Sequence, residues 1–134
     1  MTHFTLGFIG FGNLAKRWYS GFKTIIDQKT TPIYYSELNQ LPDSFSDLKF
    51  VSLTELLNKS DIIFLAVKPH QLIELKNTLT HVDWSKKCLV SLLAGKTISK
   101  IKNNIPSIQH LIRVMPNTCA EFKQSMTVYS VLKL

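Results

Sequence analysis

A short glycine-containing stretch near the N-terminus constrains the fold of this chain more than any other feature. Residues 6–9 (Leu-Gly-Phe-Ile) are typical of a buried strand, and Gly-Phe-Gly-Asn-Leu-Ala follows at residues 10–15. Gly10 permits a tight turn, Gly12 leaves space for a pyrophosphate beside the backbone, and Ala15 allows a helix to pack closely on the strand. The N–H groups at the start of that helix favour phosphates. We therefore predict a dinucleotide-binding turn, with a glycine turn that binds nothing as the alternative.

The rest of the chain alternates between apolar runs of strand length and stretches with apolar residues at helical spacing. Asp61 is followed by a continuous apolar run at residues 62–67, and we expect the whole stretch 61–67 to form a central parallel strand covered on both faces. We expect strands at residues 6–9, 32–36, 50–51, 61–67, 88–93, 110–115 and 126–129. We expect helices at residues 13–26 and 54–58, at 72–79 with Leu72, Ile73, Leu75 and Leu79 on its apolar face, and from Thr97 or Ser99 through Ile105. This alternation predicts a single α/β domain over residues 1–134 with a doubly wound, mostly parallel sheet.

The composition fits a soluble globular domain. The 134 residues are 45% hydrophobic and 19% charged, and the longest apolar run, residues 62–67, is much too short to span a membrane. Cys88 and Cys119 are too few and too far apart to indicate a disulfide scaffold or a metal site. The first strand begins so close to the N-terminus that no room is left for a signal peptide. We therefore expect a cytoplasmic protein without a membrane segment.

The net charge of +7 is compatible with two kinds of anionic partner, a nucleic acid or a small ligand. The 16 basic residues are scattered along the chain, and no basic run alternates with aromatic residues. A solvated surface that also attracts a small anion is therefore the preferred interpretation, and no nucleic-acid partner is expected.

The end of the second expected strand bears on which dinucleotide is bound. An acidic residue there accepts hydrogen bonds from the ribose of NAD, whereas a small or basic residue accommodates the 2′-phosphate of NADP. Ser36 occupies this position and Glu37 follows it, with no arginine nearby. If Ser36 faces the ribose, NADP fits, and if Glu37 does, NAD fits. Glu37 is otherwise an exposed loop charge.

Two further segments follow strands at the edge of the sheet where ligands of such folds bind. Lys68 directly follows residues 61–67, so it either neutralises phosphate charge, lies beside a nicotinamide, or is an ordinary exposed lysine. Pro69 suits the first turn of a helix, and His70 is interpreted as a surface residue at the helix start rather than an acid–base group. Residues 94–95 (Ala-Gly) end the strand expected at 88–93.

Four stretches, at residues 7–15, 66–69, 94–95 and 113–118, together resemble pyrroline-5-carboxylate reductase, the last enzyme of proline synthesis. The Arg-Val-Met-Pro-Asn-Thr segment at 113–118 is the most specific of them. The resemblance implies a Rossmann domain that binds NADP, or alternatively NAD, and an enzyme that reduces a cyclic imine by hydride transfer. The residues expected to contact the cofactor are Gly10, Phe11, Gly12, Asn13, Leu14, Ala15, Ser36, Ala66, Val67, Lys68, Pro69, Ala94, Gly95 and Asn117.

The resemblance to this family also implies that the nicotinamide lies between residues 67–69, 94–95 and 115–117. Asn117 would orient the nicotinamide amide or the substrate, unless it is only a turn residue after Pro116. The sequence departs from the family in having Phe11 between the two glycines, Cys119 where a proline is customary and Ser125 where a glycine is common.

The family continues into a helical domain that forms the dimer and completes the substrate pocket, whereas this sequence stops at Leu134. We expect a fragment or a shortened relative that is incomplete for catalysis. The surface around residues 115–129 would then be exposed and prone to weak self-association.

No candidate catalytic or metal-binding residues are predicted, because no Ser-His-Asp or Cys-His arrangement and no paired carboxylates are found. Reduction of a protonated imine mainly requires that donor and acceptor are aligned. Two classes of function stay open, an oxidoreductase and a non-catalytic module that holds or senses NAD(P). Reductases of 2- or 3-hydroxy acids share a similar first turn, but residues 113–118 argue against them.

Overall fold

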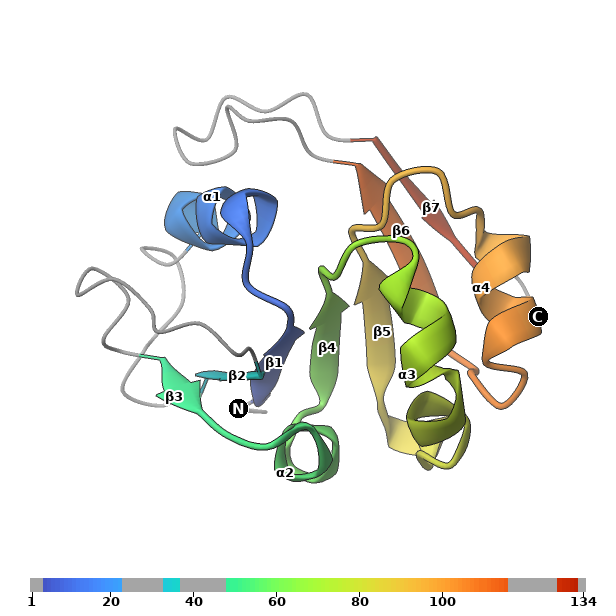
Figure 1. Ribbon diagram of the computed structural model, residues 1–134, viewed down its shortest axis with the longest axis horizontal. Coiled ribbons are helices and arrows are strands. Elements are labelled where there is room, and N and C mark those ends of the chain that lie inside the picture. The colour runs from blue at the N-terminus through green and yellow to red at the C-terminus, as the bar shows by residue number, and fades with distance from the viewer. Residues whose placement is uncertain (1–3, 23–32, 37–47, 116–127, 133–134) are drawn as a thin grey trace.

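The computed structural model describes residues 4–22, 33–36, 48–115 and 128–132 (Figure 1). Within them the strands form one seven-stranded sheet in the order β3-β2-β1-β4-β5-β6-β7. All neighbouring strands are parallel except β6 and β7, which pair antiparallel. The strands are β1 (Leu6–Ile9), β2 (Ile33–Ser36), β3 (Lys49–Phe50), β4 (Ile62–Leu65), β5 (Cys88–Ser91), β6 (Leu111–Met115) and β7 (Val128–Val131). The prediction of a doubly wound, mostly parallel sheet is confirmed.

The strand order reverses between β1 and β4, which are neighbours in the sheet although β2 and β3 lie between them in the sequence. The chain first moves outward from β1 to β3 and then returns to the other side of β1 at β4. Ile9 and Leu65, the last residues of these two strands, are partners in the register. In open α/β sheets this switch point is where ligands bind, beyond the carboxyl ends of the strands.

Helices cover both faces of the sheet. The helices are α1 (Asn13–Phe22), α2 (Leu53–Lys59), α3 (Gln71–Thr80) and α4 (Ile98–Asn104), with a short 3-10 helix, η2 (Trp84–Lys86). Ile63 and Leu65 of β4 are buried in a core with residues of α2, α3 and α4, and α3 and α4 lie side by side (Figure 1). Phe64 is buried in a second core with residues of α1. Burial on both faces explains the continuous apolar run in the sequence.

Local sequence signals explain where two of the shorter helices begin. The hydroxyl of Ser52 accepts a hydrogen bond from the backbone N–H of Glu55 at 3.2 Å, and α2 follows directly. The side chain of Thr97 accepts from the N–H of Lys100 at 3.2 Å at the start of α4. Such N-caps satisfy an N–H group that has no partner inside the helix. Of the two caps expected for α4, Thr97 is therefore the one used.

The structure corrects the expected elements in several places. The strand expected at 50–51 is β3, which lies one residue earlier, at Lys49–Phe50. The strand expected at 61–67 ends at Leu65, and the one expected at 88–93 ends at Ser91, because the following residues turn out of the sheet. Ile73 was expected on the buried face of α3, but its side chain is 68% exposed. Residues 23–26 of the first expected helix and 126–127 of the last expected strand lie outside the described residues.

Candidate functional site

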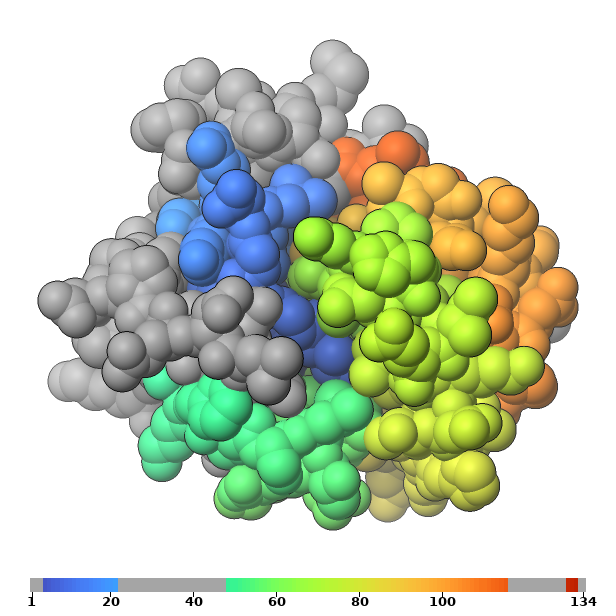
Figure 2. Space-filling model, viewed as in Figure 1, coloured from blue at the N-terminus to red at the C-terminus, as the bar shows by residue number. Residues whose placement is uncertain are grey.

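A cavity of about 740 Å³ lies at the carboxyl ends of β1 and β4, at the switch point of the sheet. In Figure 2 the darkest blue residues, at the N-terminal end of the described chain, are visible between the green residues of β3 and α2 and the lime residues of α3, and the lighter blue residues of α1 lie above them. The cavity is lined by Ile9, Gly10, Phe11, Gly12, Phe50, Val51, Ser52, Leu53, Ala66, Val67, Lys68, His70, Gln71, Glu74 and Leu75.

The two glycines of the β1–α1 turn differ in what constrains them. Gly10 has a φ of +81°, and a Cβ atom there would lie 2.9 Å from the backbone oxygen of Ala66. The fold itself therefore requires glycine at this position. A Cβ atom at Gly12 would meet no protein atom within 4 Å, and its φ is not positive. Gly12 borders open space in the cavity, so packing within the described part of the protein does not require glycine there.

The start of α1 brings the remaining residues of the predicted turn into place. The backbone N–H of Lys16 donates to the carbonyl of Gly12 at 3.0 Å, so the helix begins directly after the second glycine. Ala15 is buried, as expected where the helix packs closely on the sheet, whereas Leu14 is half-buried and Asn13 is exposed.

Phe11, the residue between the two glycines that differs from the usual pattern of the reductase family, belongs to the core beside the site. Its side chain is only 1% exposed, and its ring meets that of Phe8 edge to face with the centroids 5.0 Å apart. A second edge contact, at 6.0 Å, joins it to Tyr19 of α1. The bulky residue therefore packs beneath the turn and does not fill the space beside Gly12.

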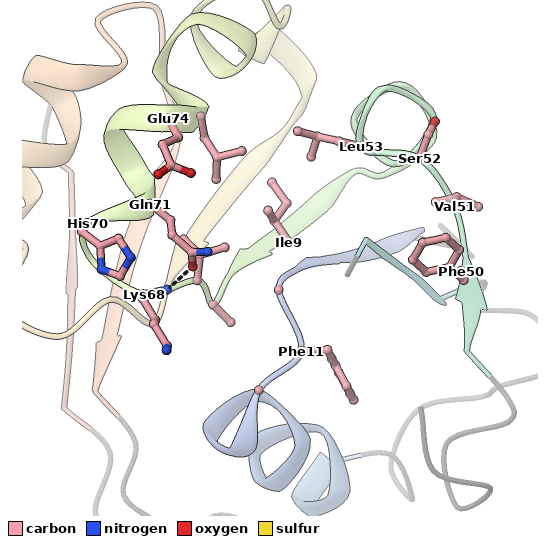
Figure 3. Close-up of a pocket in the computed structure, with 15 residues that line it drawn as sticks. Ile9, Phe11, Phe50, Val51, Ser52, Leu53, Lys68, His70, Gln71 and Glu74 are labelled. Atoms are coloured by element: carbon pink, nitrogen blue, oxygen red, sulfur yellow. Dashed lines mark hydrogen bonds between the residues drawn. The ribbon is translucent and has the colours of Figure 1, made fainter. Parts of the chain in front are cut away.

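The segment between β4 and α3 forms the wall of the cavity opposite α1 (Figure 3). Ala66 and Val67 are half-buried and Lys68 is exposed, and all three line the cavity. Gln71 contacts this segment, because its Oε1 accepts a hydrogen bond from the backbone N–H of Lys68 at 2.9 Å. His70 lines the cavity and makes no capping hydrogen bond through its side chain, whereas Pro69 precedes α3 outside the cavity.

The third wall of the cavity was not predicted from the sequence. Residues 50–53, at the end of β3 and the start of α2, line the cavity together with Gln71, Glu74 and Leu75 of α3. The available signals were the Ser-x-x-Glu cap at residues 52–55, which marks a helix start next to a short strand, and the apolar spacing in α3. Neither signal showed that these two segments face each other across the switch point.

Some predicted cofactor contacts are not brought into this cavity. Ala94 and Gly95 follow β5 at the same edge of the sheet, and Gly95 has a φ of +69°, but neither lines the cavity. Ser36 ends β2 and pairs in register with Ile9, so its backbone lies at the binding edge. Its side chain, Glu37 and Asn117 lie outside what the structure describes.

Neither a metal-binding cluster nor a membrane-spanning helix is found in the part of the chain that the structure describes. Residues 4–22, 33–36, 48–115 and 128–132 contain no group of three or more His, Cys, Asp or Glu side chains placed to hold a metal ion. In the same part of the chain, no helix has the length and apolar character needed to cross a membrane.

Comparison with known proteins adds a family and several relatives. Residues 5–95 match the family model described as NADP oxidoreductase coenzyme F420-dependent. The chain is 32% identical over 132 residues to a pyrroline-5-carboxylate reductase of Haemophilus influenzae, covering 94% of this chain and 48% of the relative. It is 36% identical over 120 residues to pyrroline-5-carboxylate reductase 3 of Danio rerio, covering 84% and 40%.

The same similarity is seen among solved structures. The crystal structure of Plasmodium falciparum pyrroline carboxylate reductase with NADP bound superposes with a TM-score of 0.81 at 27% identity, over 97% of this chain and 48% of that one. The chain thus spans about half the length of the curated relatives it matches. The resemblance inferred from the four sequence stretches is confirmed by these similarities.

Proposed function

The chain belongs to the family described as NADP oxidoreductase coenzyme F420-dependent, and on that premise we propose that it is the cofactor-binding domain of a pyrroline-5-carboxylate reductase. The observation that carries the proposal is the open space beside Gly12 in the cavity at the switch point. A glycine that the fold does not need, between a buried strand and a helix start, fits a pyrophosphate group that approaches the backbone.

In the proposed complex, the pyrophosphate lies over Gly10, Phe11, Gly12, Asn13, Leu14 and Ala15. The ammonium group of Lys68, exposed at the cavity, faces the anionic part of the dinucleotide. Ala66, Val67, Pro69, Ala94, Gly95 and Asn117 complete the set and surround the nicotinamide half. When bound, the reduced cofactor would supply the hydride, and the residues of this chain would bind and orient it.

We propose NADP as the preferred dinucleotide, with NAD as the alternative. Ser36 ends β2 at the binding edge beside β1, and a small hydroxyl residue is compatible with a 2′-phosphate. The net charge of +7 favours the more anionic cofactor. The relative from Plasmodium falciparum has NADP bound. Glu37 is the main argument against this preference.

The proposed substrate is a small cyclic imine, by similarity to the named relatives. A second candidate is a module that holds or senses NAD(P) without catalysis. It is favoured by one observation, that Ala94, Gly95 and Met115 do not line the cavity at the switch point. Two of the three segments that would surround the reacting ring are therefore separate from the cavity to which we assign dinucleotide binding.

We also propose a cytoplasmic location and weak self-association. Met115 of β6 is 47% exposed and Val131 of β7 is 50% exposed, which leaves apolar surface on two neighbouring strands. The register pairs Met115 with Val128 and Val131 with Ile112, so these are two separate apolar spots on one strand pair, which fits only weak association.

Oxidation of NADPH in the presence of pyrroline-5-carboxylate tests the reaction. We expect the 134-residue chain to bind NADPH but to turn over slowly beside a full-length relative. Misplacement of donor and acceptor by about 1 Å costs on the order of a hundredfold in rate. Turnover within a few fold of the full-length enzyme would contradict the expected incompleteness, and binding without any turnover in a single-turnover mixture would favour the non-catalytic module.

A further inference from the structure

Gln71 and Lys68 are joined by two hydrogen bonds that run in opposite directions. The backbone N–H of Gln71 donates to the carbonyl oxygen of Lys68 at 2.9 Å. The side-chain Oε1 of Gln71 accepts from the backbone N–H of Lys68, also at 2.9 Å (Figure 3). The Gln71 side chain thus makes one of the two bonds of a capping box, and the backbone bond closes a turn with Pro69 at its second position, where a missing N–H costs nothing.

Residues 66–68 lead from β4 to this turn, and their first residue is hydrogen-bonded to β1. The backbone N–H of Ala66 donates to the carbonyl of Ile9 at 2.9 Å. The backbone oxygen of Ala66 also lies so close to Gly10 that a Cβ atom there would come within 2.9 Å of it. Residues 66–68 are thus fixed at one end by the glycine turn and at the other by Gln71. These contacts fix the backbone position from which the Lys68 side chain extends.

We propose that Gln71 is a positioning residue that sets where Lys68 presents its ammonium group to the dinucleotide. This inference rests on the proposed function, because it requires that an anionic ligand occupies the cavity. The reason is geometric: without the acceptor at Gln71, the Lys68 N–H has no partner from α3 and the peptide between residues 67 and 68 is free to rotate. The charge would then be spread over several positions and its attraction to phosphate would weaken.

Two other roles for Gln71 give different results. If it only caps α3, its loss lowers stability but leaves the contribution of Lys68 to binding unchanged. If its amide contacts the ligand directly, its contribution to binding does not depend on Lys68. A double-mutant cycle between the two side chains separates these cases, because residues that act through one another are not additive.

The test uses Gln71→Leu, which removes the acceptor at similar volume, with Gln71→Ala as a second version should the leucine variant fold poorly. Lys68→Met and the double variant complete the cycle. Gln109→Leu is the matched control, because Gln109 is exposed and does not line the cavity. Gln71→Glu retains an acceptor for the Lys68 N–H.

The first readout is hydrogen exchange of the Lys68 amide, which requires no cofactor. We expect protection in the wild type, the Gln71→Glu variant and the Gln109→Leu control, and its loss in Gln71→Leu. Equal protection in the wild type and Gln71→Leu would overturn the proposal, because Gln71 would not hold Lys68.

The second readout is the Kd for NADPH by fluorescence titration. We expect Gln71→Leu to raise the Kd roughly two- to tenfold when Lys68 is present, the range for one hydrogen bond, and to have almost no further effect in the Lys68→Met chain. The same factor in both backgrounds would overturn the proposal. A wild-type chain that does not bind NADPH would instead overturn the proposed function, and the amide exchange would still report on the contact between Gln71 and Lys68.

Discussion

The backbone N–H of Ala66 donates to the carbonyl of Ile9 at 2.9 Å and so joins the ends of β4 and β1 where the strand order reverses. Beyond this bond the two chains diverge, β1 into the glycine turn and β4 toward Lys68 and α3. The cavity lies between them. The candidate site is therefore a direct consequence of the sheet topology, as in other open α/β sheets.

The difference between the two glycines predicts that substitution by alanine lowers stability at Gly10 much more than at Gly12. Gly10→Ala should lower the free energy of unfolding by about 1–3 kcal/mol, because its φ is +81° and the new Cβ would lie 2.9 Å from the Ala66 oxygen. Gly12→Ala, the matched control, should change it by less than about 0.5 kcal/mol, as for a surface substitution. Urea unfolding measures both, and equal losses would contradict the assignment of their roles.

Cofactor preference should follow the residue at the end of β2. At moderate salt we expect NADPH to bind more tightly than NADH by roughly ten- to a hundredfold, which corresponds to about 1.5–3 kcal/mol for a charge-assisted contact. Competition between the two dinucleotides measures the ratio. Ser36→Ala should reduce it and Glu37→Gln should not. NADH binding as tight as NADPH would mean that Glu37 contacts the ribose and that NAD is the natural cofactor.

Asp83 should make stability depend on pH in the acid range. Hydrogen bonds from Ser85, through its side chain and then its backbone, hold the pKa of Asp83 below its ordinary value of 3.8, and the backbone bond measures 3.0 Å. Because the folded pKa is depressed, the stabilisation is fully present above the unfolded pKa and is lost as pH falls through the folded one.

The difference in unfolding free energy between the wild type and Asp83→Ala should therefore be constant near neutral pH and shrink below about pH 4. Asp83→Asn, which retains an acceptor for the Ser85 N–H but does not titrate, is the control. A difference that grows as the pH falls would show that the carboxylate is not stabilised in the folded chain.

The thiol of Cys88 should react slowly. Burial raises the pKa of Cys88 above its ordinary value of 9.0, because desolvation disfavours the thiolate. In a Cys119→Ser chain, where Cys88 is the remaining cysteine, alkylation by iodoacetamide at pH 8 should be slower than that of glutathione, and its rate should keep rising above pH 9. Reaction as fast as that of glutathione would contradict a half-buried, protonated thiol.

Much of the fold was accessible from local sequence because each signal has a local cause. The apolar run of β4 reflects burial on both faces, and the glycine at position 10 reflects a turn that other residues cannot adopt. The end of β4 was predicted too late, because the apolar run continues through Val67 and nothing local indicates that the chain turns out of the sheet after Leu65. Ile73 was assigned to the buried face of α3 on hydrophobicity alone, whereas Leu72 and Leu79 provide that face and Ile73 points away from it.

The candidate site was only partly predictable for a related reason. Its glycine turn is one continuous segment, so the spacing of Gly10 and Gly12 was sufficient to find the part of the cavity that this turn lines. The wall made by residues 50–53 and by Glu74 exists only because α2 and α3 are brought together across the switch point. The contact of Gln71 with Lys68 is local, and the Lys-Pro-x-Gln spacing that produces it was present in the sequence.

Titration of NADPH fluorescence with the wild type, Gly12→Ala and Gly12→Val tests the central claim most directly. The claim is that the pyrophosphate of a dinucleotide lies beside Gly12, where the protein leaves open space. We expect saturable binding to the wild type, weaker binding to Gly12→Ala, and an affinity at least about tenfold lower for Gly12→Val, equivalent to about 1.4 kcal/mol. A cooperative urea-unfolding transition in each of the three chains would show that all of them are folded. Unchanged affinity in a folded Gly12→Val chain would contradict the account.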